Sequence, residues 1–360
     1  MRVAQIGCGQ ISAAHLQAYA ASPLAELVAV VDVDEAAARE TAAALGGVPW
    51  TTRFEDVLER PDVDIVSIAT PHHLHAPQVI AAAGAGKHVL CEKPLTTTLP
   101  AAQEMIDACR GAGVKLGMWF VARYTAPYRM ARTLLRAGAI GELVNIRLPD
   151  VHNKVQDYYQ RGVGGRARPS EWRGGRATSG GGALIMNAIH QIDALRFATG
   201  LEATRVSAEW VNFTGLAEVE DMIAVLLRYS NGAIGTIDTA NYAPGGGEPS
   251  ILRLYGTRGQ LQLTGRTLRA YVQEAPAAPA AAREGQSGAE DVPALIPGEW
   301  QDVPLPTLGD SRTLLLEDYV RALQEGREPP VSGADGKACL AIVLGAYESA
   351  ASGRSVVLGA

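Results

Sequence analysis

The stretch VLCEKPL, residues 89–95, ends a predicted strand with a carboxylate, an ammonium group and a proline. In an open α/β sheet, ligands bind outside the carboxyl ends of the strands, so this strand would deliver Glu92 and Lys93 into a ligand crevice. A buried lysine beside another positive charge loses its proton readily, which an arginine does not. Proline reduces the trans preference to about 0.5–1 kcal/mol, so the Lys93–Pro94 bond can be cis. The alternative is a surface turn with a solvated lysine.

A second candidate for proton transfer is His190, on a helix predicted to begin at the triple glycine 180–182. Met186, His190 and Asp193 share one face of that helix, because offsets of three and four residues stack along the same side. With a reference pKa of about 6.5, a histidine there is suited to act as a general base near neutrality. The alternative is a histidine that only packs between domains.

The sequence GCGQIS at residues 7–12 has the spacing of a dinucleotide-binding turn, with Ser12 in place of the third glycine. Gly7 would permit the tight turn, and Gly9 would let the backbone approach a pyrophosphate at the N-terminus of the next helix. Gln10 and Ile11 are predicted to line the same cofactor. The alternative is that the glycines serve only helix–strand packing.

Asp32 ends the second predicted strand, 20 residues after Ser12. A carboxylate at this position accepts hydrogen bonds from the adenine ribose and repels a 2′-phosphate. Its neighbour is Val33 rather than an arginine, which favours NAD over NADP, although Asp34 and Arg39 keep NADP as a less favoured choice. Asp32 could instead cap the helix that begins at residue 34.

Apolar runs alternate with helical segments up to about residue 120, which predicts a doubly wound parallel sheet, a Rossmann-type α/β domain over 1–122. After it, helices near 126–138, 311–325 and 334–352 accompany Val- and Ile-rich runs with Gly and Asn turns. This pattern predicts an α+β domain with a mainly antiparallel sheet over 123–360.

The composition is that of an ordinary soluble globular protein, with 47% hydrophobic and 19% charged residues and a formal net charge of -6. It contains neither a basic block for nucleic acid nor an apolar run of about 18 residues for a membrane span. No signal-peptide pattern opens the chain, and the cysteines lack the paired spacing of a zinc site, which together predict a cytoplasmic protein with reduced thiols and no metal. Small metabolites are the expected partners.

Three stretches together resemble the Gfo/Idh/MocA family of oxidoreductases, the group of glucose–fructose oxidoreductase and inositol dehydrogenase. They are GCGQISAAH at 7–15, ATPHHLHAPQVIAAAGAGKHVLCEKPL at 69–95, and GGGALIMNAIHQIDAL at 180–195. The resemblance spans nearly the whole chain. It implies a Rossmann domain followed by an α+β domain with an open-faced sheet, here the contact surface of a homodimer or homotetramer. It also implies reversible oxidation of a sugar or polyol hydroxyl with NAD or NADP.

By this resemblance, Lys93 is the catalytic lysine and contacts both the hydroxyl and the nicotinamide side of the site. Glu92 holds the nicotinamide end or orients the lysine, and His190 takes the hydroxyl proton. The full set of expected cofactor contacts is Gly7, Gly9, Gln10, Ile11, Asp32, Thr70, His75, Glu92, Lys93 and Arg123.

The resemblance breaks at one position of the second helix. The family commonly has an Asp or Asn four residues before the histidine, whereas this chain has Met186, which cannot accept a proton. The relay is then Lys93 with His190 alone, or it recruits Asn187 or Asp193. Otherwise, the oxidation-competent site has decayed.

Residues 149–178 form a long segment with little periodicity, which predicts a mobile loop over the substrate pocket. Its hydroxyl, amide and ring side chains suit a carbohydrate. Its surplus of Lys and Arg suits either a sugar acid or phosphate, or subunit contacts on a solvated loop. The predicted substrate contacts are Tyr124, His152, Asn153, Trp172, Asn187 and Asp193.

The leading hypothesis is an NAD-dependent dehydrogenase that oxidises a secondary hydroxyl of a sugar, polyol or sugar derivative to a ketone. Two alternatives use the same residues: a redox-neutral glycosidase or lyase with tightly held NAD, and a dinucleotide-sensing regulator with weak or no turnover.

Overall fold

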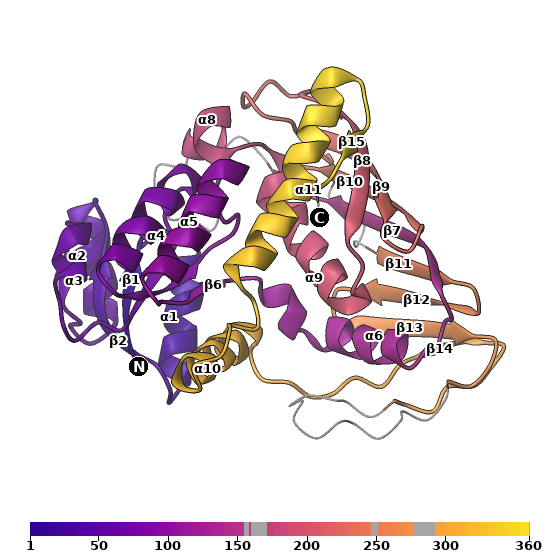
Figure 1. Ribbon diagram of the computed structural model, residues 1–360, viewed down its shortest axis with the longest axis horizontal. Helices are drawn as coiled ribbons and strands as arrows, with labels where there is room; N and C mark the ends of the chain where they lie inside the picture. The colour runs from indigo at the N-terminus through magenta and orange to yellow at the C-terminus, as the bar shows by residue number, and fades with distance from the viewer. Residues whose placement is uncertain (155–157, 160–170, 246–250, 277–291, 360) are drawn as a thin grey trace.

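The first half of the chain folds around a parallel sheet (Figure 1). The computed structural model describes residues 1–154, 158–159, 171–245, 251–276 and 292–359. The six strands lie in the order β3-β2-β1-β4-β5-β6, and every neighbouring pair is parallel. The chain order reverses between β1 and β4, the place where such sheets bind a dinucleotide. The strands are β1 (Arg2–Ile6), β2 (Glu26–Val31), β3 (Trp50–Thr51), β4 (Ile65–Ile68), β5 (His88–Cys91) and β6 (Leu116–Met118).

Helices cover both faces of this sheet, as its apolar strands require. All four residues of β4 are buried, so neither face of that strand meets solvent. Helix α4 packs beside α5 on one side, and α1 packs beside the late helix α10. The helices are α1 (Ser12–Ala21), α2 (Glu35–Ala44), α3 (Phe54–Leu58), α4 (His75–Gly84), α5 (Leu99–Gly111) and α10 (Ser311–Gln324).

The second half contains a nine-stranded sheet in the order β14-β13-β12-β11-β7-β10-β9-β8-β15. Only the central pair, β7 and β10, is parallel among the described strand pairs of this sheet. The strands are β7 (Leu143–Val151), β8 (Ala203–Val211), β9 (Met222–Tyr229), β10 (Ile234–Ala240), β11 (Ile251–Gly256), β12 (Gly259–Thr264), β13 (Thr267–Val272), β14 (Trp300–Asp302) and β15 (Val356–Val357).

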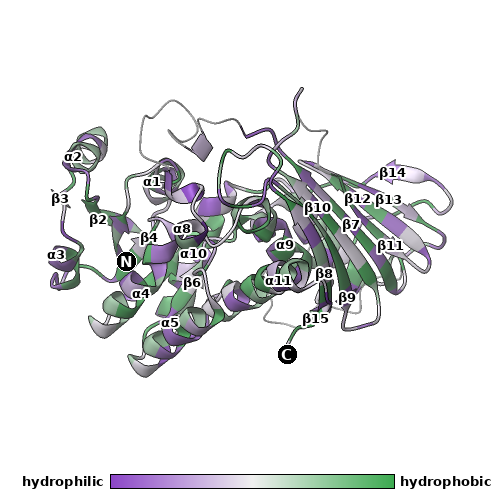
Figure 2. Ribbon diagram, turned by 90° about the horizontal axis from the view of Figure 1, so that it is seen from above, coloured by the Kyte–Doolittle hydropathy of each residue, from purple (hydrophilic) through white to green (hydrophobic). Residues whose placement is uncertain are grey.

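Helices α6 (Ala126–Arg136), α9 (Ile189–Thr199) and α11 (Gly333–Ser352) cover one face of this sheet and lie between it and the first domain (Figures 1 and 2). The other face is open. Burial alternates along β9, and the exposed face carries Val144, Met222, Leu226 and Ile234. The predicted fold class, a parallel α/β domain followed by an α+β domain with an open, mainly antiparallel sheet, is confirmed.

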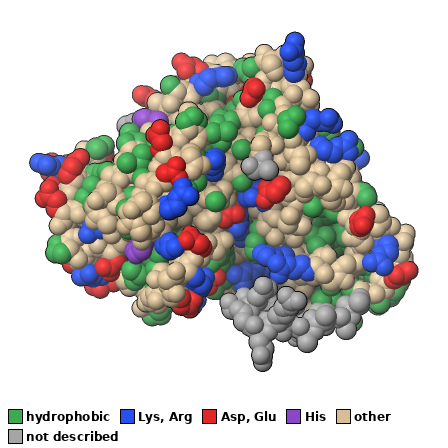
Figure 3. All heavy atoms as spheres, in the orientation of Figure 1, with side chains coloured by type: hydrophobic (Ala, Val, Ile, Leu, Met, Phe, Trp, Pro, Cys, Tyr) green, Lys and Arg blue, Asp and Glu red, His purple; other side chains and the backbone are tan. Residues whose placement is uncertain are grey.

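The surface shown in Figure 3 mixes acidic, basic and apolar side chains. Within the described ranges, no helix has the length and apolar character needed to cross a membrane.

The two halves are joined by α10, which returns from the second half to the first sheet. Tyr319 is fully buried, and its hydroxyl donates to the carbonyl oxygen of Val89 on β5 at 2.8 Å. A Cβ on Gly117 of β6 would lie 2.6 Å from the Tyr319 ring, so the glycine leaves room for it. Beside it, the Met118 N–H donates to the carbonyl of Val331 at 3.0 Å. The strand that carries Lys93 is therefore held from behind by the C-terminal segment.

Replacing Tyr319 with Ala should lower the free energy of unfolding by about 3–5 kcal/mol, because a large buried ring leaves a cavity. Tyr319→Phe keeps the ring and should cost only about 1 kcal/mol for the lost hydrogen bond. Urea titration followed by circular dichroism measures both values. Phe213→Ala is the matched control, since Phe213 is 82% exposed and should change stability by less than about 0.5 kcal/mol. Equal effects of Tyr319→Ala and Phe213→Ala would contradict the role given to α10.

Candidate active site

The turn after β1 has the shape that a dinucleotide requires. Gly7 has φ 91°, and a Cβ there would lie 2.6 Å from the carbonyl oxygen of Ala69 at the end of β4. A Cβ on Gly9 would meet no described atom within 4 Å, so the backbone there faces open space that a pyrophosphate can enter. Helix α1 begins at Ser12, and its N-cap residue, Ile11, makes no side-chain capping hydrogen bond, which leaves N–H groups of the first turn for an anion.

Asp32 is tied to this turn by two backbone hydrogen bonds. Its carboxylate accepts from the N–H of Cys8 at 2.7 Å and from the N–H of Asp34 at 2.9 Å. The cap of α2 is Asp34, which accepts from Ala37, so Asp32 is not used as the helix cap. Each carboxylate oxygen keeps a further lone pair for a ribose hydroxyl.

Two loops at the carboxyl ends of β4 and β5 are clamped together by His75. Its Nδ1 lies 2.8 Å from the carbonyl oxygen of Pro94, and its Nε2 lies 2.9 Å from that of Thr70. The Thr70 hydroxyl donates to Gln78 at 2.6 Å. Both ring nitrogens of the buried His75 thus face backbone carbonyls. The residue predicted to touch the cofactor holds in place the loops that surround it.

Glu92 is linked to the cofactor turn through helix α1. Its Oε1 lies 2.9 Å from Nε2 of His15, and its Oε2 accepts from the Lys93 N–H at 3.0 Å. The His15 ring stacks on Trp119 with centroids 4.3 Å apart and planes 10° apart. Burial raises the pKa of Glu92, but the His15 hydrogen bond and the nearby positive groups together outweigh burial, and the pKa falls to about 2. His15 is fully buried, and it orients Glu92.

Lys93 reaches from the first domain to the second. Its Nζ donates to the carbonyl oxygen of Met186 at 2.6 Å, and the Lys93–Pro94 peptide is cis. Burial lowers the pKa of Lys93, and the charge of Glu92 opposes this change. The positive charges of Arg173 and Lys154 lower it further. The lysine is therefore brought closer to the neutral form that can accept a proton.

The helix that carries His190 starts with a π-helical turn over Leu184–Ala188, in which the Ile189 N–H donates to the Leu184 carbonyl five residues back. Such turns are frequent at functional sites. Met186 takes part through its backbone carbonyl, while its side chain is buried. The side chain of the next residue, Asn187, donates to Oδ1 of Asn241 at 2.6 Å.

His190 is kept neutral in this site. Burial, and then the charge of Lys93, lower its pKa to about 3. Its Nδ1 is buried and has no hydrogen-bond partner among the residues that the structure describes. Phe120 lies edge-on to the ring, with centroids 6.2 Å apart.

Three predicted contacts are placed elsewhere. Arg123 donates to both carboxylate oxygens of Asp193, at 2.5 and 2.7 Å, and lies 2.8 Å from Asp335 of α11. Asp193 is fully buried. Tyr124 is buried under the guanidinium of Arg129, 4.9 Å from its ring centroid. These side chains join α9 and α11 to the segment after β6, which leaves a cofactor role for Arg123 and substrate roles for Tyr124 and Asp193 without geometric support.

In the described part of residues 149–178, two cations lie over one ring. The ring centroid of Tyr158 lies 4.9 Å from Lys154 Nζ and 5.2 Å from the guanidinium carbon of Arg173. Trp172 meets the ring of His72, centroids 4.6 Å apart, on the loop after β4. His152 lies beside Asp150 at the end of β7, and Asn153 is exposed. The predicted loop residues Arg161, Arg166 and Arg168 lie outside the described part.

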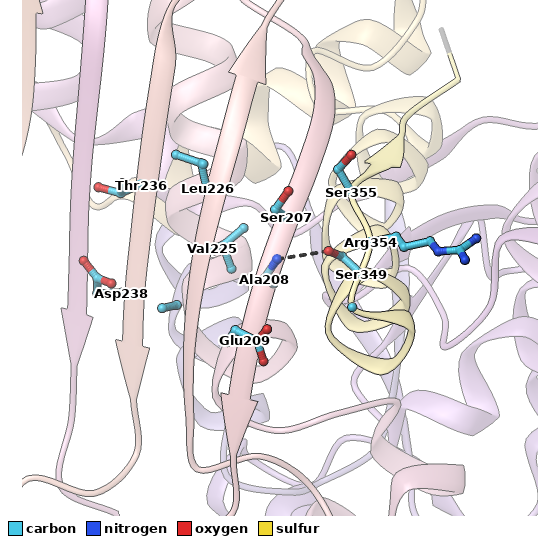
Figure 4. A pocket seen from close by; sticks show the side chains of 12 residues that line it. Ser207, Ala208, Glu209, Val225, Leu226, Thr236, Asp238, Ser349, Arg354 and Ser355 are labelled. Carbon is cyan, nitrogen blue, oxygen red and sulfur yellow. Dashed lines mark hydrogen bonds between the residues drawn. The ribbon is translucent and has the colours of Figure 1, made fainter.

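A separate shallow pocket lies where the end of α11 meets β8, β9 and β10 (Figure 4). Its lining includes Glu209, Leu226, Asp238 and Arg354, and the Ala208 N–H donates to the Ser349 hydroxyl beside it. None of the predicted site residues lines it. Among the described residues, no cluster of His, Cys, Asp and Glu could hold a metal ion.

Family models match both halves of the chain. Residues 1–120 match the oxidoreductase family with an NAD-binding Rossmann fold, and residues 128–262 match the GFO/IDH/MocA C-terminal domain. The chain belongs to the GFO/IDH/MocA family. It is an oxidoreductase that uses NAD, and the turn at Gly7 and Gly9 with Asp32 fits that cofactor.

Relatives of known activity cover nearly the full length. Levoglucosan dehydrogenase from Pseudarthrobacter phenanthrenivorans is 30% identical over 98% of this chain and 96% of its own. Myo-inositol 2-dehydrogenase from Thermotoga maritima is 29% identical over 99% and 98% of the two chains. A solved levoglucosan dehydrogenase in complex with NADH superposes with a TM-score of 0.84 at 27% identity, covering 100% of this chain and 99% of that one.

Asp32→Ser should reduce affinity for NADH by roughly ten- to a hundredfold, because two charge-assisted hydrogen bonds to ribose hydroxyls are lost. Affinity for NADPH should rise, since the repelling carboxylate is gone. Fluorescence titration with both nucleotides measures the ratio. Asp107→Ser, an exposed change on α5, is the control. A ratio of NADH to NADPH affinity unchanged by Asp32→Ser would contradict the ribose assignment.

Proposed function

We propose that this family member oxidises a secondary hydroxyl of a neutral sugar, polyol or sugar derivative to a ketone, with Lys93 as the proton acceptor and His190 as a hydrogen-bond partner of the hydroxyl. The observation that carries the proposal is the position of Lys93. It stands at the carboxyl end of β5, has a lowered pKa, and is aimed by the Met186 carbonyl toward the helix of His190. The named activities of the relatives support the substrate class.

The chain's own groups divide the work as follows. NAD supplies the hydride acceptor. Asp32 and the turn at Gly9 hold the dinucleotide, and the His15–Glu92 pair links that turn to the backbone of Lys93. Lys93 takes the hydroxyl proton as the carbon loses hydride, which leaves a ketone and an ammonium group.

The electrostatic surroundings of the two candidate bases favour Lys93 over His190 as the proton acceptor. An imidazole whose pKa is about 3 is a weak base, because burial penalises the cation that it would form. The ordinary pKa of the lysine is 10.5, and the charges of Glu92 and Asp150 oppose the lowering that burial causes, which favours Lys93 as the proton acceptor. His190 is then a neutral partner that orients the hydroxyl through a ring nitrogen. The sequence alone favoured His190 as the base.

The open face of the second sheet supports the predicted homo-oligomer, since Val144, Met222, Leu226 and Ile234 expose apolar surface there. A homodimer or homotetramer through this face, in the cytoplasm, remains part of the proposal.

Lys93→Met should lower kcat by about 10²–10⁴-fold, the usual contribution of a positioned acid–base group, and leave NADH affinity within about threefold. NADH absorbance with levoglucosan, myo-inositol and other polyols measures turnover, and fluorescence titration measures NADH affinity. Lys115→Met removes a lysine of the β6 edge and is the control. A Lys93→Met enzyme with normal kcat would reject the assignment. Wild-type enzyme that binds NAD but accumulates no NADH would favour the redox-neutral alternative.

The pH profile separates the two bases. If neutral Lys93 is needed, kcat/KM for oxidation should rise with increasing pH and level off below the lysine's ordinary pKa of 10.5. His190→Asn should keep that rise at a lower plateau. A profile that is flat through neutrality in the wild type would instead assign the base to a group with a low pKa, as His190 has.

A further inference from the structure

Asp150 is a buried carboxylate with one oxygen that no described residue satisfies. The residue is 3% exposed, and its Oδ1 lies 3.2 Å from Nε2 of His152. Its Oδ2 is buried and has no hydrogen-bond partner among the residues that the structure describes. Such an orphaned acceptor is rare in a native interior, because each buried polar group that lacks a partner loses its hydration without compensation.

The strand β7 aims this carboxylate at the active site. Burial alternates along β7, so Asp150 shares the covered face with Ile146 and Leu148. In the sheet, Asp150 pairs with Thr239 of β10, whose hydroxyl donates to the Asp150 carbonyl at 2.9 Å. The neighbouring strand β10 contacts the π-helical turn that holds Lys93.

A series of hydrogen bonds connects the end of β7 to the turn that binds Lys93. The His152 N–H donates to the carbonyl of Ala240 at 2.8 Å, and the next residue, Asn241, receives the side-chain bond of Asn187. Asn187 directly follows Met186, which accepts from Lys93. In agreement, the charge of Asp150 raises the pKa of both Lys93 and Lys154.

The chemistry of the free oxygen selects its ligand. An ionised carboxylate only accepts hydrogen bonds, so its partner must be a donor. A sugar hydroxyl is such a donor, and O–H to carboxylate bonds are short and strong. A carboxylate or phosphate on the substrate would be repelled at this point.

We propose that Asp150 is a substrate-binding residue that accepts, through Oδ2, a second hydroxyl of the same molecule whose first hydroxyl is oxidised at Lys93. His152 is a positioning residue that fixes the other carboxylate oxygen. The inference rests on the proposed function, and it makes the enzyme selective for neutral polyhydroxy substrates over analogues that lack that one hydroxyl.

The test is binding of levoglucosan, its three monodeoxy analogues and myo-inositol to the NADH complex by calorimetry. In the wild type, one deoxy analogue should bind at least about tenfold more weakly than levoglucosan. In Asp150→Ala, which leaves no hydrogen-bonding group at this position, that discrimination should shrink to about onefold, whereas NADH affinity should hold. Asp107→Ala is the matched control, because this exposed residue lies on α5, away from both the site and the open sheet face.

Several outcomes would overturn the inference. They are an unchanged discrimination ratio in Asp150→Ala, an equal loss of all sugars and NADH, or no binding of any of these neutral probes to the wild type. Asp150→Ser, which also removes the carboxylate, decides the matter if Asp150→Ala does not fold. Sugar binding with the expected selectivity but without NADH formation would overturn the proposed oxidation and leave Asp150 as a binding residue.

Discussion

The bond from Lys93 Nζ to the Met186 carbonyl is the contact on which the site depends, because it joins the two domains at the reacting group. A lysine has four rotatable bonds and loses much conformational freedom when it is fixed. Here the cost is offset at both ends. Tyr319 binds strand β5 through the Val89 carbonyl, and the acceptor of the lysine is a backbone carbonyl within a helical turn, which has no side-chain rotation to lose.

The same contact places the ammonium group in a balanced field. Glu92 favours its charge, while burial and the nearby Arg173 and Lys154 disfavour it. Because Glu92 is itself held ionised by His15, a residue of the cofactor helix, the electrostatics of the lysine are coupled to the dinucleotide turn. A change in the packing of α1 would therefore alter the proton affinity of Lys93 without touching it. Asp150 adds a second negative charge from the second domain, which opposes the lowering of the Lys93 pKa.

The parallel sheet and the end of β5 could be predicted from sequence, because apolar strands and a Glu-Lys-Pro terminus carry a strong local signal. The partners could not. The helical offsets placed Asp193 beside His190, but Asp193 faces Arg123, a residue 70 positions away, and only tertiary packing reveals that pairing. The segment from residue 149 lacked periodicity, so Asp150 was assigned to a loop, whereas β7 continues through Val151 and makes it a residue of the covered face. The link from His15 to Glu92 spans 77 positions and has no sequence signal short of the fold itself.

At Met186, the backbone and not the side chain makes the contact with the lysine of the site. A thioether cannot accept or donate a proton, so the Met186 side chain offers no partner for proton transfer with Lys93. In the π-helical turn, the group that accepts from Lys93 is the backbone carbonyl of residue 186, which every residue type possesses. In the same turn, the side chain of Asn187 donates to Asn241 and is not used in proton transfer. What matters at residue 186 is then the course of the helix, and the carboxylate of the site can come from a strand of the sheet instead.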